Sequence, residues 1–454
     1  MWRYIGYRVV LFIPTTIAIL LIAFLLSRQT FDVDTAESWL IYDGIDPNSV
    51  EGNKAYEREY KLQNLNLPLF YFSIIPAHYH PNLNSIIDRQ DRKILSSLQS
   101  EGYRCEDVLT LLEVRKNLLS TLNYRIIPDS ILQALNFAES IHDFQAISSM
   151  LNYESEQAQT LNGKFHKTIQ KMEERKVHFI SPSFVWHGIK NQWHLWSINM
   201  LNGNMGKSIK DGRKVSQKIW NAMRWTLILL GLNLIFTLII SIPFGIWSGL
   251  KTGSWFDRLT QSFWMMLYAT PVFWLASMLI MYFTSDRYGT WMDIFPVPGL
   301  WHTEPNQTFW SFLKVNSHQF ILPVICLVAN DIAFLSRVVR NNVRENLNKR
   351  YTKVAAAKGL SQTLVLVKHV IPNVLIPLVT IVVAAIPAGL SGGLIIEVLF
   401  NIPGVGRLMY ESIQTQDWNV VFSILAIISL AVTLFLLVGD VLYAFVNPKV
   451  SIDE

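Results

Sequence analysis

Charged residues are scarce in this chain: they make up 16% of its 454 residues, where an ordinary globular domain has about 25%. Cysteine is scarcer still, with Cys105 and Cys326 alone. The first lies in a hydrophilic segment and the second in an apolar one, so a disulfide between them is not expected. Apolar residues make up 51% and are gathered into long runs. The composition therefore argues against a purely soluble protein and against a disulfide scaffold.

Motifs for catalysis and metal binding are also missing. No H-E-x-x-H occurs, which argues against a membrane metalloprotease. The stretch "NGNMGKS" at 202–208 ends like a phosphate-binding loop, but Leu201 stands where that loop needs glycine. His78 and His80 offer two imidazoles, fewer ligands than a metal site needs. We therefore predict no catalytic residues, no ATPase site, no bound metal and no cofactor.

Long apolar runs are what the chain has in abundance. A helix that crosses the hydrocarbon of a membrane needs about 20 residues at about 1.5 Å each. The sequence predicts six such helices, in the runs Val9–Leu26, Trp225–Leu250, Leu259–Thr284, Phe320–Val339, Val374–Ile396 and Trp418–Gly439. The first run could instead be a secretory signal, but its apolar core is long and no cleavage site follows it in "LLSRQTFDVD". We expect a retained span there.

The basic residues predict the orientation of these spans. With the N-terminus in the cytoplasm, the short cytoplasmic connections hold thirteen Lys and Arg, and the short external ones hold three. Such an excess of Lys and Arg marks the cytoplasmic side of a membrane protein. Both termini are therefore expected in the cytoplasm. Because topology accounts for the clustering of basic residues, the net charge of +5 does not suggest a nucleic-acid partner.

The hydrophilic segment after the first span is expected outside the cell. We divide the chain into a first span (1–27), an extracytoplasmic region (28–215), a core of spans two to six (216–447) and a cytoplasmic tail (448–454). Between about residues 80 and 180, apolar residues recur at helical spacing and strand-like alternation is scarce. These residues are Val108, Leu111, Leu112, Leu118, Leu119, Ile131, Leu135, Ala138, Leu161, Phe165, Ile169 and Met172. The sequence thus predicts an all-α integral membrane protein with a mostly helical insertion at about 74–185.

A basic segment, "KVAAAKGLSQTLVLVKHVIPN" at 353–373, separates the fourth and fifth runs. It is too charged to lie in lipid and too regular for a slack linker. Gly359 is expected to end one helix, and Ser361 to cap a second short helix that Pro372 helps to close. Two interpretations stay open from the residues alone. The segment could dock on an acidic partner, or it could lie as an amphipathic helix on anionic lipid.

This segment resembles the coupling loop of type I ABC importer permeases, whose pattern is E-A-A-x-x-x-G. The chain has "KVAAAKG" at 353–359, with lysine and valine in the first two positions. A basic residue there is typical of the dipeptide, oligopeptide and nickel branch of the family. Further similar stretches are "KTGSWFDR", "TPVFWLASMLIMYF", "GGLIIEVLFNIPGVGRLMYESIQTQDW" and "GDVLYAFVNPKV". The resemblance covers roughly residues 200–450 and the first span, and says nothing about 74–185.

The resemblance implies a subunit without its own ATPase site that takes up oligopeptides or dipeptides across the bacterial cytoplasmic (inner) membrane by alternating access. The implied partners are a second homologous permease, two cytoplasmic ABC ATPase subunits, an extracytoplasmic substrate-binding protein and membrane lipid. The coupling loop, placed at 341–372, would dock on an ATPase. Its implied contact residues are Lys353, Ala355, Ala356, Lys358, Gly359, Ser361, Leu364, His369 and Pro372.

Asn330 and Asp331 fall near the middle of the fourth span. An ionised Asp at that depth costs about 2.5–3.5 kcal/mol on insertion scales, so it should face the helix bundle or a wet path. We interpret the two residues as a polar lining of the translocation path that could meet a peptide amine. The alternatives are a structural pair of Asp331 with Arg337 or a shallower helix end. Glu397 and Asp440 lie at span ends and are expected at the interface, although position 397 is commonly acidic in the family.

Other functions stay open at this point. A mechanotransmission or export subunit would act through its extracytoplasmic domain, but such proteins usually have four spans and lack this coupling pattern. An ion-driven carrier predicts inverted repeats, and the sequence shows none. For the 74–185 insertion, our hypothesis is that it enlarges the docking surface for the binding protein or caps the external gate.

Overall fold

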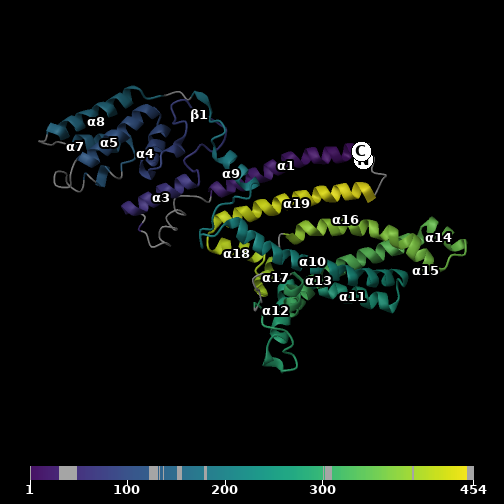
Figure 1. The fold of residues 1–454 in the computed structure, drawn as a ribbon. Helices are drawn as coiled ribbons and strands as arrows, with labels where there is room; N and C mark the ends of the chain where they lie inside the picture. Colours follow the sequence, from purple (N-terminus) through teal and green to yellow (C-terminus); the bar gives the residue numbers. More distant parts are fainter. Residues whose placement is uncertain are drawn as a thin grey trace. The chain divides into compact units, whose positions relative to one another are not determined.

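The computed structural model describes residues 2–29, 46, 49–121, 131, 133–135, 138–150, 156–177, 181–299, 301, 309–390 and 393–446. It divides into two compact units. The membrane unit comprises Met1–Phe31 and Gly203–Glu454, and the insertion unit comprises Asp32–Asn202. Helices dominate both units (Figure 1), which confirms the predicted fold class. Residues 203–215, which the sequence places in the extracytoplasmic region, belong to the same compact unit as the spans.

The membrane unit contains the predicted spans. Its long helices are α1 (Trp2–Gln29), α10 (Val215–Leu250), α13 (Phe309–Asn348), α16 (Ile371–Leu390) and α19 (Trp418–Val446). These, with α16 extended back to Gln362, are long and apolar enough to cross a membrane. A bent pair, α11 (Trp255–Ala269) and α12 (Val272–Phe283), makes a sixth if it counts as one span. Shorter elements are η2 (Asp286–Tyr288), α14 (Arg350–Ala357), α15 (Gln362–Val365), η3 (Leu366–Val370), α17 (Leu394–Leu399) and α18 (Val405–Gln414).

The third predicted span is not one straight helix. α11 and α12 meet at an angle of 94°. The break lies at Thr270 and Pro271, where Pro271 is the N-cap of α12 and Thr270 is extended with ψ 122°. A residue before proline is disfavoured in the helical region, and proline has no N–H to continue the helix. Apolar composition therefore predicted the segment, but only the proline signalled its bend.

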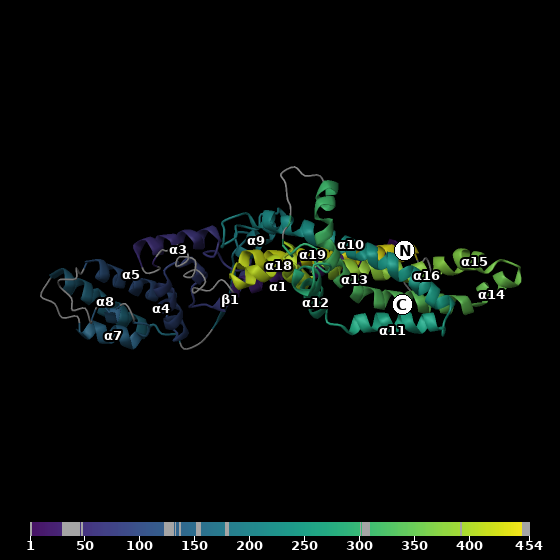
Figure 2. The ribbon, with the colours of Figure 1, turned by 90° about the horizontal axis from the view of Figure 1, so that it is seen from below.

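α10 and α13 run side by side in both views of the membrane unit (Figures 1 and 2). Their close approach depends on two glycines of α10. A methyl group on Gly245 would come within 2.6 Å of Val339 Cβ, and one on Gly249 within 2.8 Å of Val343 Cβ. Small residues four apart allow backbones to pack closely in a membrane, where no water is available to drive association. The α10–α13 pair is thus a tightly packed centre of this unit.

The insertion unit is mostly helical, as predicted. Its elements are α3 (Val50–Leu62), β1 (Phe72–Pro76), η1 (Leu83–Ser85), α4 (Arg89–Ser100), α5 (Cys105–Thr121), α7 (Ile141–Met150), α8 (Glu156–Glu174), β2 (Pro182–Trp186) and α9 (Gln192–Leu201). One apolar core joins α4, α5, α7 and α8. It contains the predicted periodic residues Val108, Leu111, Leu112, Leu118, Leu119, Ile131, Leu135, Ala138, Phe165, Ile169 and Met172. Leu161 has its side chain outside the described residues.

Two short strands were not predicted. β1 and β2 pair antiparallel, with Phe72 opposite Trp186 and Pro76 opposite Pro182. Five-residue strands this far apart in sequence have no hairpin turn between them to announce their pairing. The pairing of β1 with β2 brings residues 76 and 182 next to each other, so the two ends of the segment 77–181 lie close together.

Candidate functional site

The basic segment forms an exposed elbow, which we define as residues 349–373. α14 and α15 lie at one end of the membrane unit (Figures 1 and 2). Gly359 follows α14 in the left-handed region with φ +85°, and its N–H donates to the Ala356 carbonyl at 3.0 Å. Ser361 Oγ accepts from the Leu364 N–H at 3.3 Å. The predicted glycine turn and serine cap are therefore confirmed.

The second helix of the elbow does not close at Pro372. It runs on through the π-helical turn η3 into α16, and the Ile371 N–H donates to the Leu366 carbonyl. Such a turn changes the hydrogen-bond register within a helix, so the helix can continue past a proline. Asn373 Nδ2 also donates to the His369 carbonyl at 2.7 Å. The prediction of a separate short helix was wrong, and α15 is continuous with the fifth span.

Part of the elbow surface is free within this chain. Ala355 is buried, with 7% exposure, so it is not available to a partner at the surface. Ser361 is exposed, although its hydroxyl serves as the cap, and His369 is half-buried. The other exposed residues of the elbow include Lys353, Val354, Ala356, Lys358, Gly359, Leu364, Val367, Lys368 and Pro372. Cations and small or apolar side chains thus share the outer surface.

The elbow is anchored to the fourth span. α13 continues to Asn348, so the first part of the predicted loop 341–372 is helix. Asn346, 4% exposed, accepts from Tyr351 Oη at its Oδ1 (2.5 Å) and from Thr352 Oγ1 at its carbonyl (2.6 Å). The elbow is therefore linked directly to two spans, because α14 is hydrogen-bonded to the end of α13 and α15 is continuous with α16.

An ion pair on the same side of the spans was missed from the sequence. Arg340 Nε and Nη2 donate to Asp257 Oδ1 and Oδ2 at 2.6 and 2.7 Å. Asp257 is 2% exposed and also accepts from the Ser248 hydroxyl and from the Gly253 N–H. The pair joins the first turn of α11 to α13. Its only local signal was an acidic residue in "KTGSWFDR".

A cavity of about 530 Å³ lies between α10, α13 and α16. Its polar lining consists of Thr226, Asn233, Thr237, Asp331 and Glu397. Asp331 Oδ2 accepts from Asn233 Nδ2 at 2.8 Å, and Asn233 Oδ1 accepts from the Thr237 hydroxyl at 3.3 Å. A carboxylate therefore faces the cavity from the middle of α13, supported by α10.

The two polar residues predicted in α13 separate in the structure. Asp331 lines the cavity, whereas Asn330 is not among the residues that line it. Consecutive residues on a helix point about 100° apart, which accounts for the difference. Among the ion pairs of the described residues, none joins Asp331 to Arg337.

Glu397 does not lie at an aqueous interface as expected. It is completely buried, and its carboxylate accepts from the Thr226 hydroxyl at 2.8 Å and from the Arg407 N–H at 3.0 Å. The fifth span also ends earlier than predicted, because α16 stops at Leu390 and Glu397 belongs to the separate helix α17. The side chain of Asp440 lies outside the described residues.

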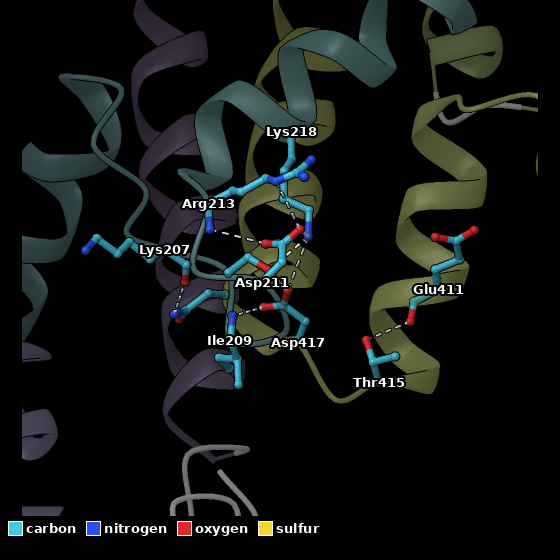
Figure 3. A network of polar contacts seen from close by, with 10 residues as sticks. Lys207, Ile209, Asp211, Arg213, Lys218, Glu411, Thr415 and Asp417 are labelled. Carbon is cyan, nitrogen blue, oxygen red and sulfur yellow. Dashed lines mark hydrogen bonds and ion pairs between the residues drawn. The ribbon is translucent and has the colours of Figure 1, made fainter. Parts of the chain in front are cut away.

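A second polar cluster joins the approach to α10 with the start of α19 (Figure 3). Asp417, 1% exposed, accepts from the Ser208 hydroxyl at 2.5 Å and from the Ile209 N–H at 3.1 Å. Lys218 Nζ lies 3.2 Å from Asp211 and 3.8 Å from Asp417. The "MGKS" stretch thus supplies its serine to a carboxylate. Lys218 is part of the cluster, within a helix α10 that begins at Val215.

Asp211 in this cluster has a lowered pKa. Partial burial raises its pKa, but the nearby Ser208 hydroxyl, the hydrogen bond from the Arg213 N–H and the hydrogen bond and charge of Lys218 outweigh that effect. The carboxylate is therefore held in its charged form, which keeps Lys218 attracted to residues 208–213.

Residues 241–452 match the family described as "Binding-protein-dependent transport system inner membrane component". The chain is 34% identical over 262 residues to the oligopeptide transport system permease protein AppB of Bacillus subtilis (strain 168), covering 57% of this chain and 80% of AppB. It is 29% identical over 312 residues to the dipeptide transport system permease protein DppB of Alkalihalophilus pseudofirmus, covering 65% and 90%.

A solved structure is also similar. It shows inward facing conformations of the MetNI methionine ABC transporter, with a TM-score of 0.38, 15% identity, and coverage of 51% of this chain and 97% of that chain. A likeness of this size supports no conclusion about the present chain.

Proposed function

This chain belongs to the family of binding-protein-dependent transport system inner membrane components, and from that premise we propose that it carries oligopeptides or dipeptides into the cell. In the proposed complex it pairs with a second homologous permease. Two cytoplasmic ABC ATPase subunits bind the elbow surfaces of the permeases, and an extracytoplasmic binding protein delivers the peptide. AppB and DppB, by their names, serve oligopeptide and dipeptide transport, which supports this substrate class.

The structure of the elbow is the main support for this proposal. Its outer surface combines small side chains, which allow close approach, with Lys353, Lys358 and Lys368, which suit an acidic groove. α15 continues without a break into α16, so movement of a docked ATPase would turn the fifth span directly. A flexible linker at this position would absorb the movement instead. The rigid connection therefore supports a role in alternating access.

Asp331 supplies a binding group for the proposed substrate. In a cavity with otherwise mostly apolar walls, its carboxylate suits the protonated amino terminus of a peptide. The hydrogen bond from Asn233 orients the carboxylate toward the cavity. We propose Asp331, rather than Asn330, as the polar residue of the translocation path.

The proposed orientation follows the distribution of Lys and Arg. It places the elbow and both termini in the cytoplasm and the insertion unit outside. The insertion unit would then enlarge the docking surface for the binding protein. The rival function, a mechanotransmission or export subunit, is not favoured, because the named relatives are permeases over most of their length.

The test is reconstitution of the complex. The chain would be purified with its co-assembled subunits, the subunits identified by mass spectrometry, and the complex placed in proteoliposomes. ATP-dependent entry of labelled dipeptides and longer peptides, only in the presence of the binding protein, is the expected result. A complex that lacks an ATPase subunit, or that hydrolyses ATP without moving any peptide of the panel, would overturn the proposal.

A further inference from the structure

The buried carboxylate of Glu397 lies where three elements of the membrane unit meet. α17 carries it, α10 contributes Thr226, and the N-terminus of α18 lies against both. We define the α17–α18 cap as residues 394–414. Within the membrane unit, this cap lies at the opposite end of α16 from the elbow (Figure 1). Twenty helical residues separate these ends, a length of about 30 Å.

Glu397 and Thr226 do for α18 what an N-cap side chain does for other helices. The first N–H groups of a helix have no partner within it. The N-cap of α18 is Gly404, which has no side chain to accept from them. Instead, the Val405 N–H donates to Thr226 Oγ1 at 2.9 Å, and the Arg407 N–H donates to Glu397 Oε2 at 3.0 Å. A carboxylate is also favoured at a helix N-terminus by the helix dipole.

The backbone is shaped to admit this carboxylate. A methyl group on Gly404 would meet the Glu397 carboxyl carbon at 2.4 Å, and one on Gly406 would lie 3.0 Å from Glu397 Oε2. Glycine at both positions lets the loop of "NIPGVGR" wrap around the carboxylate. No cation pairs with Glu397 among the ion pairs of the described residues, so hydrogen bonds alone hold its carboxyl group.

Glu397 and Thr226 also line the 530 Å³ cavity. The connection is therefore part of the cavity wall on the side of the cap, and not a remote structural contact. We propose that Glu397 is a positioning residue that closes the cap end of the cavity, by capping α18 and tying it to Thr226 of α10. This inference rests on the proposed transport function, because closure of that end matters only if a solute passes through the cavity.

Opening of the cap end would separate α18 from Glu397 or from Thr226. A glutamine at position 397 keeps the size of the side chain, but it has only one acceptor oxygen, so its NH₂ group would face either the Thr226 hydroxyl or the Arg407 N–H. Because a buried donor left without an acceptor is costly, we expect Glu397→Gln to raise the open fraction about tenfold. The variant should then leak at the cap end without a general loosening of the bundle.

The experiment measures access to a thiol in the cavity from each side of the membrane. Cys105 and Cys326 are replaced by Ser and Ala, and Ala385→Cys places a reporter in the cavity wall. The whole complex is labelled with a membrane-impermeant maleimide in right-side-out and in inverted vesicles. Glu397→Gln is expected to raise the labelling rate about tenfold from the cap side and to leave the rate from the elbow side unchanged. Equal rates in wild type and variant, or an equal rise from both sides, would overturn the inference.

Two further variants make the result specific. Thr226→Val removes the hydroxyl that links Glu397 to Val405, and it should raise labelling from the cap side as well, even if Glu397→Gln fails to assemble. Glu411→Gln removes a carboxylate of α18 that pairs with the Arg407 side chain at 2.7 Å but does not accept from the first N–H groups of the helix, so it should leave labelling from the cap side unchanged. Labelling needs no transported solute, and peptide uptake is measured in the same vesicles. Side-specific labelling without any wild-type uptake would therefore remove the proposed function and not the cap.

Discussion

Asp257 and Arg340 form a bidentate ion pair that joins α11 to α13, with nitrogen–oxygen distances of 2.6 and 2.7 Å. Arg340 is itself largely buried, with 18% of its side chain exposed, and Asp257 has 3%. Each charge is therefore stabilised by the other, and the Asp257 carboxylate is stabilised further by hydrogen bonds from the Ser248 hydroxyl and the Gly253 N–H. The pair holds the loop between the second and third spans against the fourth.

Arg340→Ala should destabilise the protein, because it leaves the Asp257 carboxylate buried without its cation. Breaking a buried pair in this way costs about 3–5 kcal/mol. The measurement is the thermal midpoint of the detergent-purified complex, compared with Arg344→Ala on an exposed turn of the same helix. If both variants lower the midpoint equally, the ion pair has no special role.

Gly359→Pro should uncouple ATP hydrolysis from uptake while membrane insertion stays normal. A side chain at this position meets no atom within 4 Å, so the effect arises from the backbone conformation at φ +85° and from the loss of the N–H that donates to Ala356. The left-handed conformation costs a non-glycine residue about 1–2 kcal/mol of conformational free energy, and asparagine tolerates it best. Gly359→Asn is therefore the matched control and should retain uptake, with Gly359→Asp between the two. Normal uptake by Gly359→Pro at equal abundance would contradict the role of the turn.

Asp331→Asn should reduce the uptake of peptides with a free amino terminus about tenfold or more, since a charged hydrogen bond contributes about 1.5–3 kcal/mol. Peptides with an acetylated amino terminus should lose little more than they do in the wild type. Asn330→Ala, one position away, should have no effect. Initial uptake rates in proteoliposomes decide the question, and an equal loss for both classes of peptide would count against amine recognition.

Asp211 predicts a dependence on pH. Its pKa is lower in the folded protein than in the unfolded chain, so its stabilising effect is complete above the unfolded value of about 3.9 and is lost as the pH falls through the folded value. The difference in thermal midpoint between wild type and Asp211→Asn should be constant near neutral pH and shrink below about pH 4. A difference that grows on acidification would show that the carboxylate is not stabilised in its charged form.

Removal of residues 77–181, with a two-residue Asn-Gly turn joining β1 to β2, should weaken association with the binding protein. This deletion is feasible because the paired strands β1 and β2 already lie side by side and need only a hairpin turn to join them. Surface plasmon resonance against the purified binding protein measures the effect. Unchanged affinity and uptake would leave the insertion without the proposed docking role.

Local signals were sufficient for much of this architecture. Apolar runs identified the spans, Gly359 and Ser361 identified the elbow, and residues such as Leu111 and Phe165 identified the core of the insertion unit. Contacts between residues far apart in sequence could not be predicted, because nothing in the sequence around Glu397 or Asp257 indicates that Thr226 or Arg340 is its partner. Pro271 and Pro372 show the limit most clearly: both are prolines in apolar surroundings, yet one breaks a helix and the other lies within one.

The glycine contacts between α10 and α13 restrict how this protein can change shape. At Gly245 and Gly249 of α10, the side chains of Val339 and Val343 of α13 lie so close that they leave no room for even one added methyl group. We therefore expect the second and fourth spans to move together when the protein changes shape. Probes fixed to that pair would keep a constant separation, while the spans around it change theirs.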